Sequence, residues 1–370
     1  MSLTYIEINR RNLFHNLRQF KNIAPHSELW PVVKSNAYGH GFLEIISLLN
    51  EAKEVSGLAV VNLSEALLAR DLSSLPVMVL SYFDSSAKDL LREALVQQII
   101  LPIYNQESYQ AIATLAAEQS IRALVNIKID TGTHRLGFSV EDQDLVAEIV
   151  DNQHLKVVGF FTHFAESEAE NLHFTEEQQA ILDQITKPWP KIKKHSACSA
   201  AAISYQPARK DMIRLGLSLY GLWPSFATQK RGMVQGVNLL PVLSLKTKII
   251  QIKKIKAGDG VGYNRTFIAD EDIDLAILPI GYYEGLPRSL SNVGQVLING
   301  QRCRIRGNIC MNLTMVELPK VQQSKVGDEV VLIGQSREES MTVEELASKA
   351  QTIAYEIVAR LNSSLEKIIV

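Results

Sequence analysis

Cationic and hydroxylic side chains follow several short apolar runs in the first two thirds of the chain. They are Lys34, Lys128, Arg135, His163, His195, Ser199 and Arg214. The sequence has no HExxH motif, no acidic group spaced for a metal and no carboxylate pair of the glycosidase type. The set therefore suits an anionic ligand. Lys34 stands where a lysine could form a Schiff base with an aldehyde, provided that burial and neighbouring cations keep its amine neutral.

Each of these residues taken alone also has an ordinary structural explanation. A lysine after a strand is most often solvated, and a histidine such as His163 is most often a core residue. Arg214 lies within an apolar run, where a buried guanidinium needs a hydrogen-bonded neighbour or a ligand. Gly216 and Leu217 end the last run, near the loop where barrels of parallel strands commonly bind phosphate, but a packing glycine explains that position equally well.

The apolar runs themselves predict buried strands. They are ELWPVV (28–33), SGLAVV (56–61), PVMVLS (76–81), IILPI (99–103), ALVNIKI (123–129), KVVGFF (156–161), KKHSA (193–197) and MIRLGL (212–217). Helical patterns lie between them, and Ser64 is predicted to cap one of these helices. About eight such units indicate an α/β TIM-like (β/α)8 barrel, whose catalytic groups lie at the C-terminal ends of the strands. An open doubly wound sheet remains the alternative, because the seventh run is weak.

The pattern changes after about residue 235. LSLKTKIIQIKKI (243–255) alternates apolar and charged residues, as one half-buried antiparallel strand would, and further alternating runs follow it. Thr342 and Glu345 form a capping-box pattern ahead of a single predicted helix over 345–361. The sequence therefore predicts a barrel domain over 12–235. It also predicts a C-terminal, mostly antiparallel β domain over 236–370, which the N-terminal strand in 1–11 joins.

Composition excludes several classes of protein. The net charge is −2, so the chain lacks the basic excess of a dedicated nucleic-acid binder. Its 3 cysteines form no CxxC motif, which argues against a disulfide framework or a structural zinc site. Because the N-terminus lacks a signal-peptide pattern and no apolar stretch nears about 20 residues, we expect a cytoplasmic protein that binds neither membrane nor nucleic acid.

Nine short motifs, taken together and in this order, resemble those of alanine racemase. The resemblance runs from near residue 5 to near residue 361. Its motifs are VVKSNAYGHG (32–41), KIDTGTHRLGF (128–138), THFA (162–165), HSACSAA (195–201), MIRLGLSLYG (212–221), VGYNRTF (261–267), PIGYYEGLPR (279–288), GNICMNLTMV (307–316) and AYEIVARL (354–361).

The resemblance implies an enzyme that uses pyridoxal 5'-phosphate (PLP) on the barrel-plus-β plan already predicted. Lys34 would carry PLP as a Schiff base and act as the base on one face of the substrate. Tyr263 would act on the other face, and in this family it comes from the partner subunit of a head-to-tail homodimer with shared active sites. A phenol ordinarily keeps its proton near neutral pH, so Tyr263 would need activation, which the family assigns to His163.

The resemblance also assigns the binding residues. Arg214, supported by His195, would face the pyridine nitrogen and keep it unprotonated, which suits racemisation and disfavours transamination. Arg135 would reach the PLP phenolate oxygen and the substrate carboxylate, and the partner chain would present the Met311 N–H to that carboxylate. Lys128 matches a family position that can be carbamylated and then braces the arginine. The phosphate would be held by Tyr38, Ser199, Tyr355 and the backbone N–H groups of Gly216 and Leu217.

Two positions depart from the family pattern: Cys198 replaces an asparagine and Asn312 an aspartate. We expect both to alter rate or substrate preference, and neither touches Lys34, Tyr263 or Arg214. The resemblance implies interconversion of L- and D-alanine, supplying D-alanine for peptidoglycan. A serine or broad-specificity racemase and a non-catalytic protein of PLP homeostasis remain alternatives. Proteins of PLP homeostasis lack the β domain, which here carries Tyr263. Arg214 argues against a third alternative, a decarboxylase on the same barrel-plus-β plan.

Overall fold

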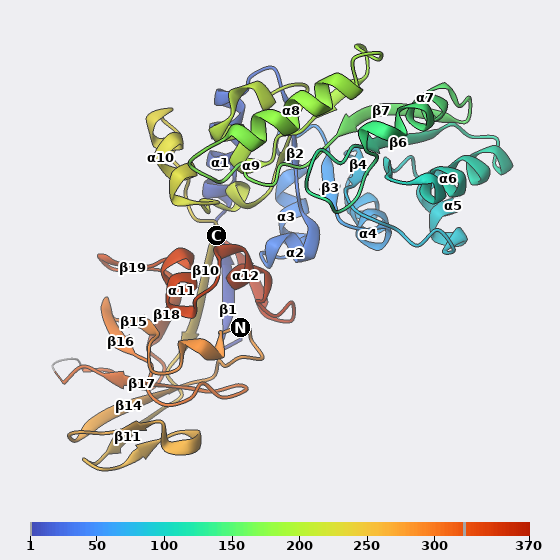
Figure 1. Ribbon diagram of the computed structural model, residues 1–370. Coiled ribbons are helices and arrows are strands. Elements are labelled where there is room, and N and C mark those ends of the chain that lie inside the picture. Colours follow the sequence, from blue (N-terminus) through green and yellow to red (C-terminus); the bar gives the residue numbers. More distant parts are fainter. Residues whose placement is uncertain (1, 321–322) are drawn as a thin grey trace. The chain divides into compact units, whose positions relative to one another are not determined.

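The computed structural model describes residues 2–320 and 323–370. The chain divides into two compact units. The barrel unit contains Phe14–Ala37 and Ile45–Leu239, and the β unit contains Met1–Leu13, Tyr38–Glu44 and Leu240–Val370 (Figure 1). Tyr38–Glu44 lies in the predicted barrel segment of the sequence but packs with the β unit.

Parallel strands of the barrel unit form a closed ring among the described residues. They are β2 (Glu28–Pro31), β3 (Leu58–Val60), β4 (Val77–Val79), β5 (Leu101–Ile103), β6 (Ala123–Lys128), β7 (Leu155–Phe161), β8 (Lys193–His195) and β9 (Met212–Leu215). Parallel ladders join β2 to β9, β3 to β4, and β5 through β8. Two isolated bridges join the segments of β2 and β3, and one joins those of β4 and β5. The Arg214 N–H donates to the Ala197 carbonyl (3.0 Å) between the last two runs. The ring confirms the barrel and rules out the open sheet.

Helices alternate with these strands, and α4 to α8 lie outside the ring (Figure 1). The helices are α1 (Arg10–Ile23), α2 (Lys34–Tyr38), α3 (Phe42–Leu49), α4 (Leu63–Leu72), α5 (Lys88–Val96), α6 (Gln106–Glu118), α7 (Gln143–Asp151), α8 (His173–Ile185), α9 (Ser199–Ser204) and α10 (Phe226–Val234). The predicted cap at Ser64 is wrong. Asn62 has the extended backbone of an N-cap, and its side chain accepts the Glu65 N–H (2.9 Å), so Ser64 lies inside the helix.

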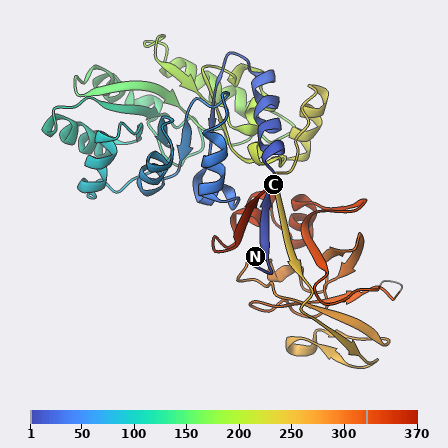
Figure 2. The same cartoon turned by 180° about the vertical axis from the view of Figure 1, so that it is seen from behind.

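The β unit is mostly antiparallel, as predicted. Its larger sheet has the order β16 (Gln301–Arg304), β15 (Gln295–Ile298), β18 (Glu329–Ser336), β10 (Leu243–Lys248), β1 (Tyr5–Ile8) and β20 (Glu366–Ile369), with β19 (Glu339–Met341) paired to β18. The smaller elements are the sheet of β11 (Gln251–Ile255), β14 (Ile273–Leu278) and β17 (Thr314–Leu318), and the ribbon of β12 (Gly260–Val261) and β13 (Phe267–Ile268). Strands β1 and β10 run side by side (Figure 2), so the N-terminal strand belongs to the larger sheet of this unit.

Two predicted elements of the β unit are each broken in two. The run 243–255 is not one strand, because the Ile249 N–H donates to Asp328 beside β18 while the Ile250 N–H donates to Ile277 in β14. The chain therefore passes from one sheet to the other at this pair. The single helix over 345–361 is also wrong. It is α11 (Val343–Ala350) and α12 (Ala354–Ala359), separated at Gln351, whose left-handed backbone (φ 57°) ends α11.

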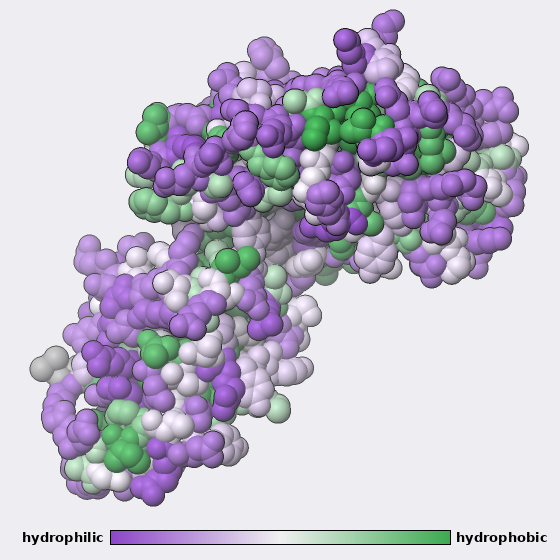
Figure 3. Space-filling view, viewed as in Figure 1, coloured by the Kyte–Doolittle hydropathy of each residue, from purple (hydrophilic) through white to green (hydrophobic). Residues whose placement is uncertain are grey.

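Apolar residues are used mainly in the cores of the two units. Figure 3 shows that hydrophilic residues cover most of the visible face, interrupted by separate hydrophobic patches. Within residues 2–320 and 323–370, no helix has both the length and the apolar character needed to cross a bilayer.

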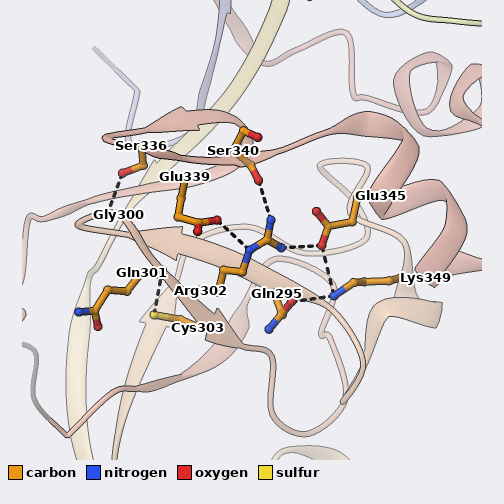
Figure 4. A network of polar contacts seen from close by, with 10 residues as sticks. All are labelled: Gln295, Gly300, Gln301, Arg302, Cys303, Ser336, Glu339, Ser340, Glu345 and Lys349. Atoms are coloured by element: carbon orange, nitrogen blue, oxygen red, sulfur yellow. Dashed lines mark hydrogen bonds and ion pairs between the residues drawn. The ribbon is translucent and has the colours of Figure 1, made fainter. Parts of the chain in front are cut away.

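A polar network fastens α11 to the larger sheet (Figure 4). Arg302 on β16 donates from Nε to Glu339 (3.0 Å), from one terminal nitrogen to Glu345 (2.6 Å) and from the other to the Ser340 carbonyl (2.8 Å). Thr342 accepts the Glu345 N–H (3.1 Å), but the Glu345 carboxylate contacts Arg302 and Lys349 rather than completing the predicted capping box. One guanidinium thus joins a hairpin and a helix start.

Replacing Arg302 with methionine should lower the free energy of unfolding by about 1 kcal/mol, a modest figure because its side chain is 35% exposed and solvent screens the pairs. Urea unfolding measures this. Lys256→Met is the matched control, since it removes an exposed pair with Asp272 on the same unit and should leave stability nearly unchanged. Equal losses in the two variants would contradict the network.

Candidate active site

The predicted cationic residues of the barrel unit gather at the carboxyl edge of its strands. Lys128 ends β6 and His195 ends β8, and both flank Phe161, the last residue of β7, in the parallel register. Arg214 lies on β9, and Lys34 follows β2, the strand paired with β9. Groups distant in the sequence therefore share one end of the barrel, where these folds place their chemistry.

Arg214 is buried and saturated with hydrogen bonds at its two terminal nitrogens. One donates to His195 Nδ1 (2.8 Å) and to the His195 carbonyl (2.7 Å), and the other donates to the carbonyls of Thr162 (2.7 Å) and Ser196 (3.1 Å). Nε donates to no acceptor among the described residues. Burial lowers the pKa of Arg214 to about 10, so the guanidinium remains charged at neutral pH with one N–H left over.

His195 supports Arg214 as a neutral ring. Because Arg214 donates to Nδ1, the ring proton must sit on Nε2. The ring stacks on Phe161, with centroids 5.2 Å apart and planes 3° apart. Burial, followed by the charges of Arg214 and Lys193, holds the pKa of His195 well below its usual value.

Lys128 is a buried lysine whose amine has a lowered pKa. Its Nζ lies 5.2 Å from the centroid of the Phe161 ring and donates to the Leu80 carbonyl at 3.4 Å. Burial, then the charges of Arg135 and Arg214, lower the pKa of Lys128 to about 8. At this pKa an appreciable fraction of the amine is unprotonated near neutral pH.

Lys34 begins a left-handed turn. Ser35, Asn36 and Ala37 have φ between 52° and 56°, and Tyr38 follows with φ 54°. This conformation is unfavourable for residues with a Cβ, by about 1–2 kcal/mol each. Glu65 compensates in part, because its two carboxylate oxygens accept the Ser35 N–H (2.8 Å) and the Val61 N–H (3.0 Å).

The amine of Lys34 shares this environment. Burial, followed by the charge of Arg135, lowers the pKa of Lys34, and Glu65 opposes the shift. The turn therefore holds a lysine with a weakened preference for the charged form, which is the state a Schiff-base lysine needs.

Arg135 is carried by a loop that Asp130 shapes. One Asp130 oxygen accepts the N–H groups of Gly132 (3.0 Å), Thr133 (3.0 Å) and His134 (3.1 Å). The Arg135 side chain is exposed, and its guanidinium has no hydrogen bond or ion pair with another described residue. It is thus available to an anionic ligand.

A buried side chain on α8 holds the backbone at His163. Gln178, fully buried on α8, donates to the His163 carbonyl (3.3 Å) and to the Thr131 hydroxyl (3.2 Å), and it accepts the Ala165 N–H (2.9 Å). Burial, then the charges of Arg214 and Arg135, lower the pKa of His163 to about 3. The ring is therefore neutral at physiological pH.

Ser199 lies beside the loop after β9. Its hydroxyl accepts the N–H groups of Gly216 (3.0 Å) and Ser218 (3.3 Å), whereas the Leu217 N–H has no acceptor among the described residues. Of the two backbone donors expected for a phosphate, Gly216 is therefore engaged with a side chain. Cys198 contacts the buried Ser167 hydroxyl (3.4 Å), so the departure at this position leaves a sulfur–oxygen contact.

Four predicted site residues belong to the β unit. Tyr263 is 71% exposed, and its carbonyl accepts the Asn308 side-chain amide (2.9 Å). Met311 is 55% exposed, and its N–H has no acceptor among the described residues. The rings of Tyr38 and Tyr355 lie 6.4 Å apart between centroids.

Gly39 brings the Tyr38 segment against α12. It has φ +80°, and a Cβ there would clash with the Val358 carbonyl oxygen. Only glycine permits this approach, which explains why Tyr38–Glu44 packs with the β unit.

Several supporting residues were missed by reasoning from the sequence. Glu65, Gln178, Asn308 and Glu284 each hold a loop that carries a predicted site residue. Gln178 carried a readable signal, because it is a polar residue at helical spacing from Leu182 and Ile185 on the buried face of α8. Glu65 lies in the first turn of α4, and Asn308 and Glu284 lie on irregular backbone, so no apolar periodicity marks these three.

The neutral, buried state of His195 predicts a loss of stability in acid. The unfolded chain takes up a proton below about pH 6.5 that the folded ring refuses, so this part of the stability is present above that pH and falls as pH decreases. Between pH 7 and pH 5 the free energy of unfolding should fall by about 2 kcal/mol from this ring. Urea unfolding at both pH values measures it. His195→Gln keeps an acceptor for Arg214 but does not titrate, so an undiminished fall in that variant would contradict the assignment.

Known protein families and relatives match this chain over nearly its whole length. The alanine racemase N-terminal domain model matches residues 8–224, and the alanine racemase C-terminal domain model matches residues 242–369. The alanine racemase of Halothermothrix orenii is 34% identical over 98% of this chain and 96% of its own length. That of Leptospira interrogans serogroup Icterohaemorrhagiae serovar Lai is 34% identical over 99% and 96%.

Solved structures give the same result. The alanine racemase of Clostridium difficile 630 matches with a TM-score of 0.92 at 30% identity, covering 100% of this chain and 96% of that one. The alanine racemase of Bacillus anthracis, solved with bound L-Ala-P, matches with a TM-score of 0.91 at 28% identity, covering 100% and 95%. With both domain models and full-length relatives in agreement, the chain belongs to the alanine racemase family, and its activity is that of an amino-acid isomerase.

Proposed function

We propose that this chain interconverts L- and D-alanine with PLP as its cofactor. The observation that carries the proposal is Arg214, a buried cation whose one unused N–H is backed by a neutral His195. A PLP ring nitrogen requires a polar partner, and the Arg214 guanidinium would be a partner that keeps its own proton. The other donors also fit PLP, because Lys34 suits an aldehyde and Ser199 and the Leu217 N–H suit a phosphate.

Bound PLP would supply an electron-withdrawing ring conjugated with the substrate, which acidifies the bond between Cα and its hydrogen. Lys34 would hold the cofactor and then move the proton at Cα on one face. Its lowered pKa supports that role, since a base must be unprotonated to accept a proton. Arg214 would leave the ring nitrogen unprotonated, which limits electron withdrawal and favours return of the proton to Cα.

Tyr263 would move the proton on the opposite face. Its 71% exposure, with that of Met311 at 55%, supports a homodimer in which each subunit lends these residues to its partner's site. His163, neutral and surrounded by cations, would accept a hydrogen bond in the relay that activates the phenol. Asn308 holds the Tyr263 backbone and would fix the direction of approach.

Arg135 and the Met311 N–H would bind the substrate carboxylate. Both are donors without a protein acceptor among the described residues, as a carboxylate site requires. Lys128 would brace Arg135. Its pKa of about 8 supports carbamylation, because carbon dioxide reacts with the unprotonated amine.

Tyr38 and Tyr355 would join Ser199 and Leu217 at the phosphate. Gly216 would contribute only if the phosphate took over its bond to the Ser199 hydroxyl. The resulting D-alanine would serve peptidoglycan synthesis in the cytoplasm, where the three cysteines remain thiols.

A racemase with serine or several amino acids as substrates is the second candidate, supported by Asn312 at a position where the family usually has aspartate. Arg214 disfavours a decarboxylase, which needs an acid at the ring nitrogen. The β unit with Tyr263 disfavours a protein that only binds PLP.

Tyr263→Phe tests the two-base proposal. With PLP and L-alanine in D2O, wild type should form D-alanine and exchange the Cα hydrogen, followed by chiral chromatography and NMR. The variant should lose roughly 100-fold or more of the racemisation rate, since a positioned base typically contributes 10²–10⁴-fold. Tyr82→Phe, at an exposed tyrosine of the barrel unit, is the control. Near wild-type racemisation by Tyr263→Phe would overturn the assignment, and faster turnover of L-serine would favour the second candidate.

Arg214→Glu tests the control of reaction type. A carboxylic acid at the ring nitrogen lets it become protonated, so transamination of alanine should rise while racemisation falls. Pyruvate released per D-alanine formed measures the partition, and PLP absorbance confirms that the variant binds cofactor. An unchanged ratio in a cofactor-loaded variant would count against the role of Arg214.

A further inference from the structure

The Met311 N–H is presented by a loop that backbone hydrogen bonds hold on both sides. The Cys310 N–H donates to the Leu313 carbonyl (2.9 Å), which closes the loop on itself. From the neighbouring loop, the Tyr282 N–H donates to Cys310 (3.1 Å) and the Tyr283 N–H donates to Met311 (2.9 Å). The direction of the remaining N–H of Met311 is thus set by how these two loops are fastened.

The fastening of the two loops includes one side-chain pair. Glu284 uses one carboxylate oxygen to accept the Gly281 N–H (2.7 Å) at the start of its own loop. Its other oxygen accepts the side-chain amide of Asn312 (2.7 Å), the residue directly after Met311. The two loops lie backbone against backbone at Gly281, since a Cβ there would clash with the carbonyls of Cys310 and Met311.

The chemistry of this pair selects asparagine. A carboxylate only accepts hydrogen bonds, so the atom facing Glu284 must be a donor. An aspartate at 312 would bring two carboxylates within hydrogen-bond distance, and like charges at that separation repel strongly. Asn312 therefore suits Glu284 in this chain and leaves one negative charge, rather than two, beside the carboxylate-binding N–H.

We propose that Asn312 and Glu284 are positioning residues that hold the Met311 N–H in place for the substrate carboxylate. The proposal rests on the proposed function, in which Met311 binds that carboxylate. The hydrogen bond acts equally on bound substrate and on the transition state, so its loss raises KM more than it lowers kcat.

The test is a reversal of the hydrogen bond. Asn312→Asp should raise KM for L-alanine about tenfold, the effect of losing a hydrogen bond to a charged group, with kcat within about twofold. Adding Glu284→Gln should restore KM to within about twofold of wild type. In that double variant the glutamine still accepts the Gly281 N–H through its oxygen, and its nitrogen donates to the carboxylate introduced at position 312.

A binding measurement separates positioning from turnover. Calorimetric titration of PLP-loaded protein with propionate, a carboxylate without the amino group, should show the same weakening in Asn312→Asp and the same recovery in the double variant. Asn238→Asp, at an exposed position of the barrel unit, controls for the added charge.

The outcomes separate a failure of the proposed function from a failure of the positioning role. A wild-type protein that binds PLP but does not racemise alanine overturns the proposed function. An active wild type whose Asn312→Asp variant keeps KM and propionate affinity overturns the positioning role. A double variant as weak as the single one does the same, since a merely disruptive substitution is not repaired by a second change.

Discussion

The arrangement of the barrel end depends on a single buried cation. Arg214 is removed from water, and carbonyl oxygens from the ends of two neighbouring strand segments replace its hydration. Burial is the largest cause of the lowered pKa values of His195, Lys128 and His163, and the charge of Arg214 lowers all three further. Its hydrogen bond to Nδ1 also fixes the tautomer of His195. Burial and this charge together keep both histidine rings neutral.

The left-handed turn after Lys34 carries backbone strain at the candidate site. Ser35, Asn36 and Ala37 occupy a backbone region that suits glycine, and only Asn36 is a residue type enriched there. The turn persists because Glu65 takes up the Ser35 N–H and because buried Ala37 donates its N–H to Val33 (2.9 Å). The sequence KSNAY does not predict this turn, since contacts from another helix balance its strain.

What the sequence could predict follows the range of the forces involved. Eight apolar runs located the barrel strands, because burial between helices demands continuous apolar residues. The errors came where a long-range choice overrides a local pattern. The alternation through Ile249 and Ile250 is continuous, yet the two residues bond to different sheets, and Gln351 ends a helix that its neighbours would have continued. At the site, residue types identified the cations, whereas Gln178 and Glu284 act through backbone groups that composition does not reveal.

Strand β1 has a consequence for how the chain assembles. It is made first, but its neighbours in the sheet are β10 and β20, so residues 5–8 pair with 243–246 and with 366–369. During synthesis β1 cannot pair until β10 has emerged, and its other edge stays unpaired until β20 follows, whereas every strand of the barrel ring lies between β1 and β10 in the chain. The fold therefore has an order of completion, in which the larger sheet of the β unit closes after the barrel ring.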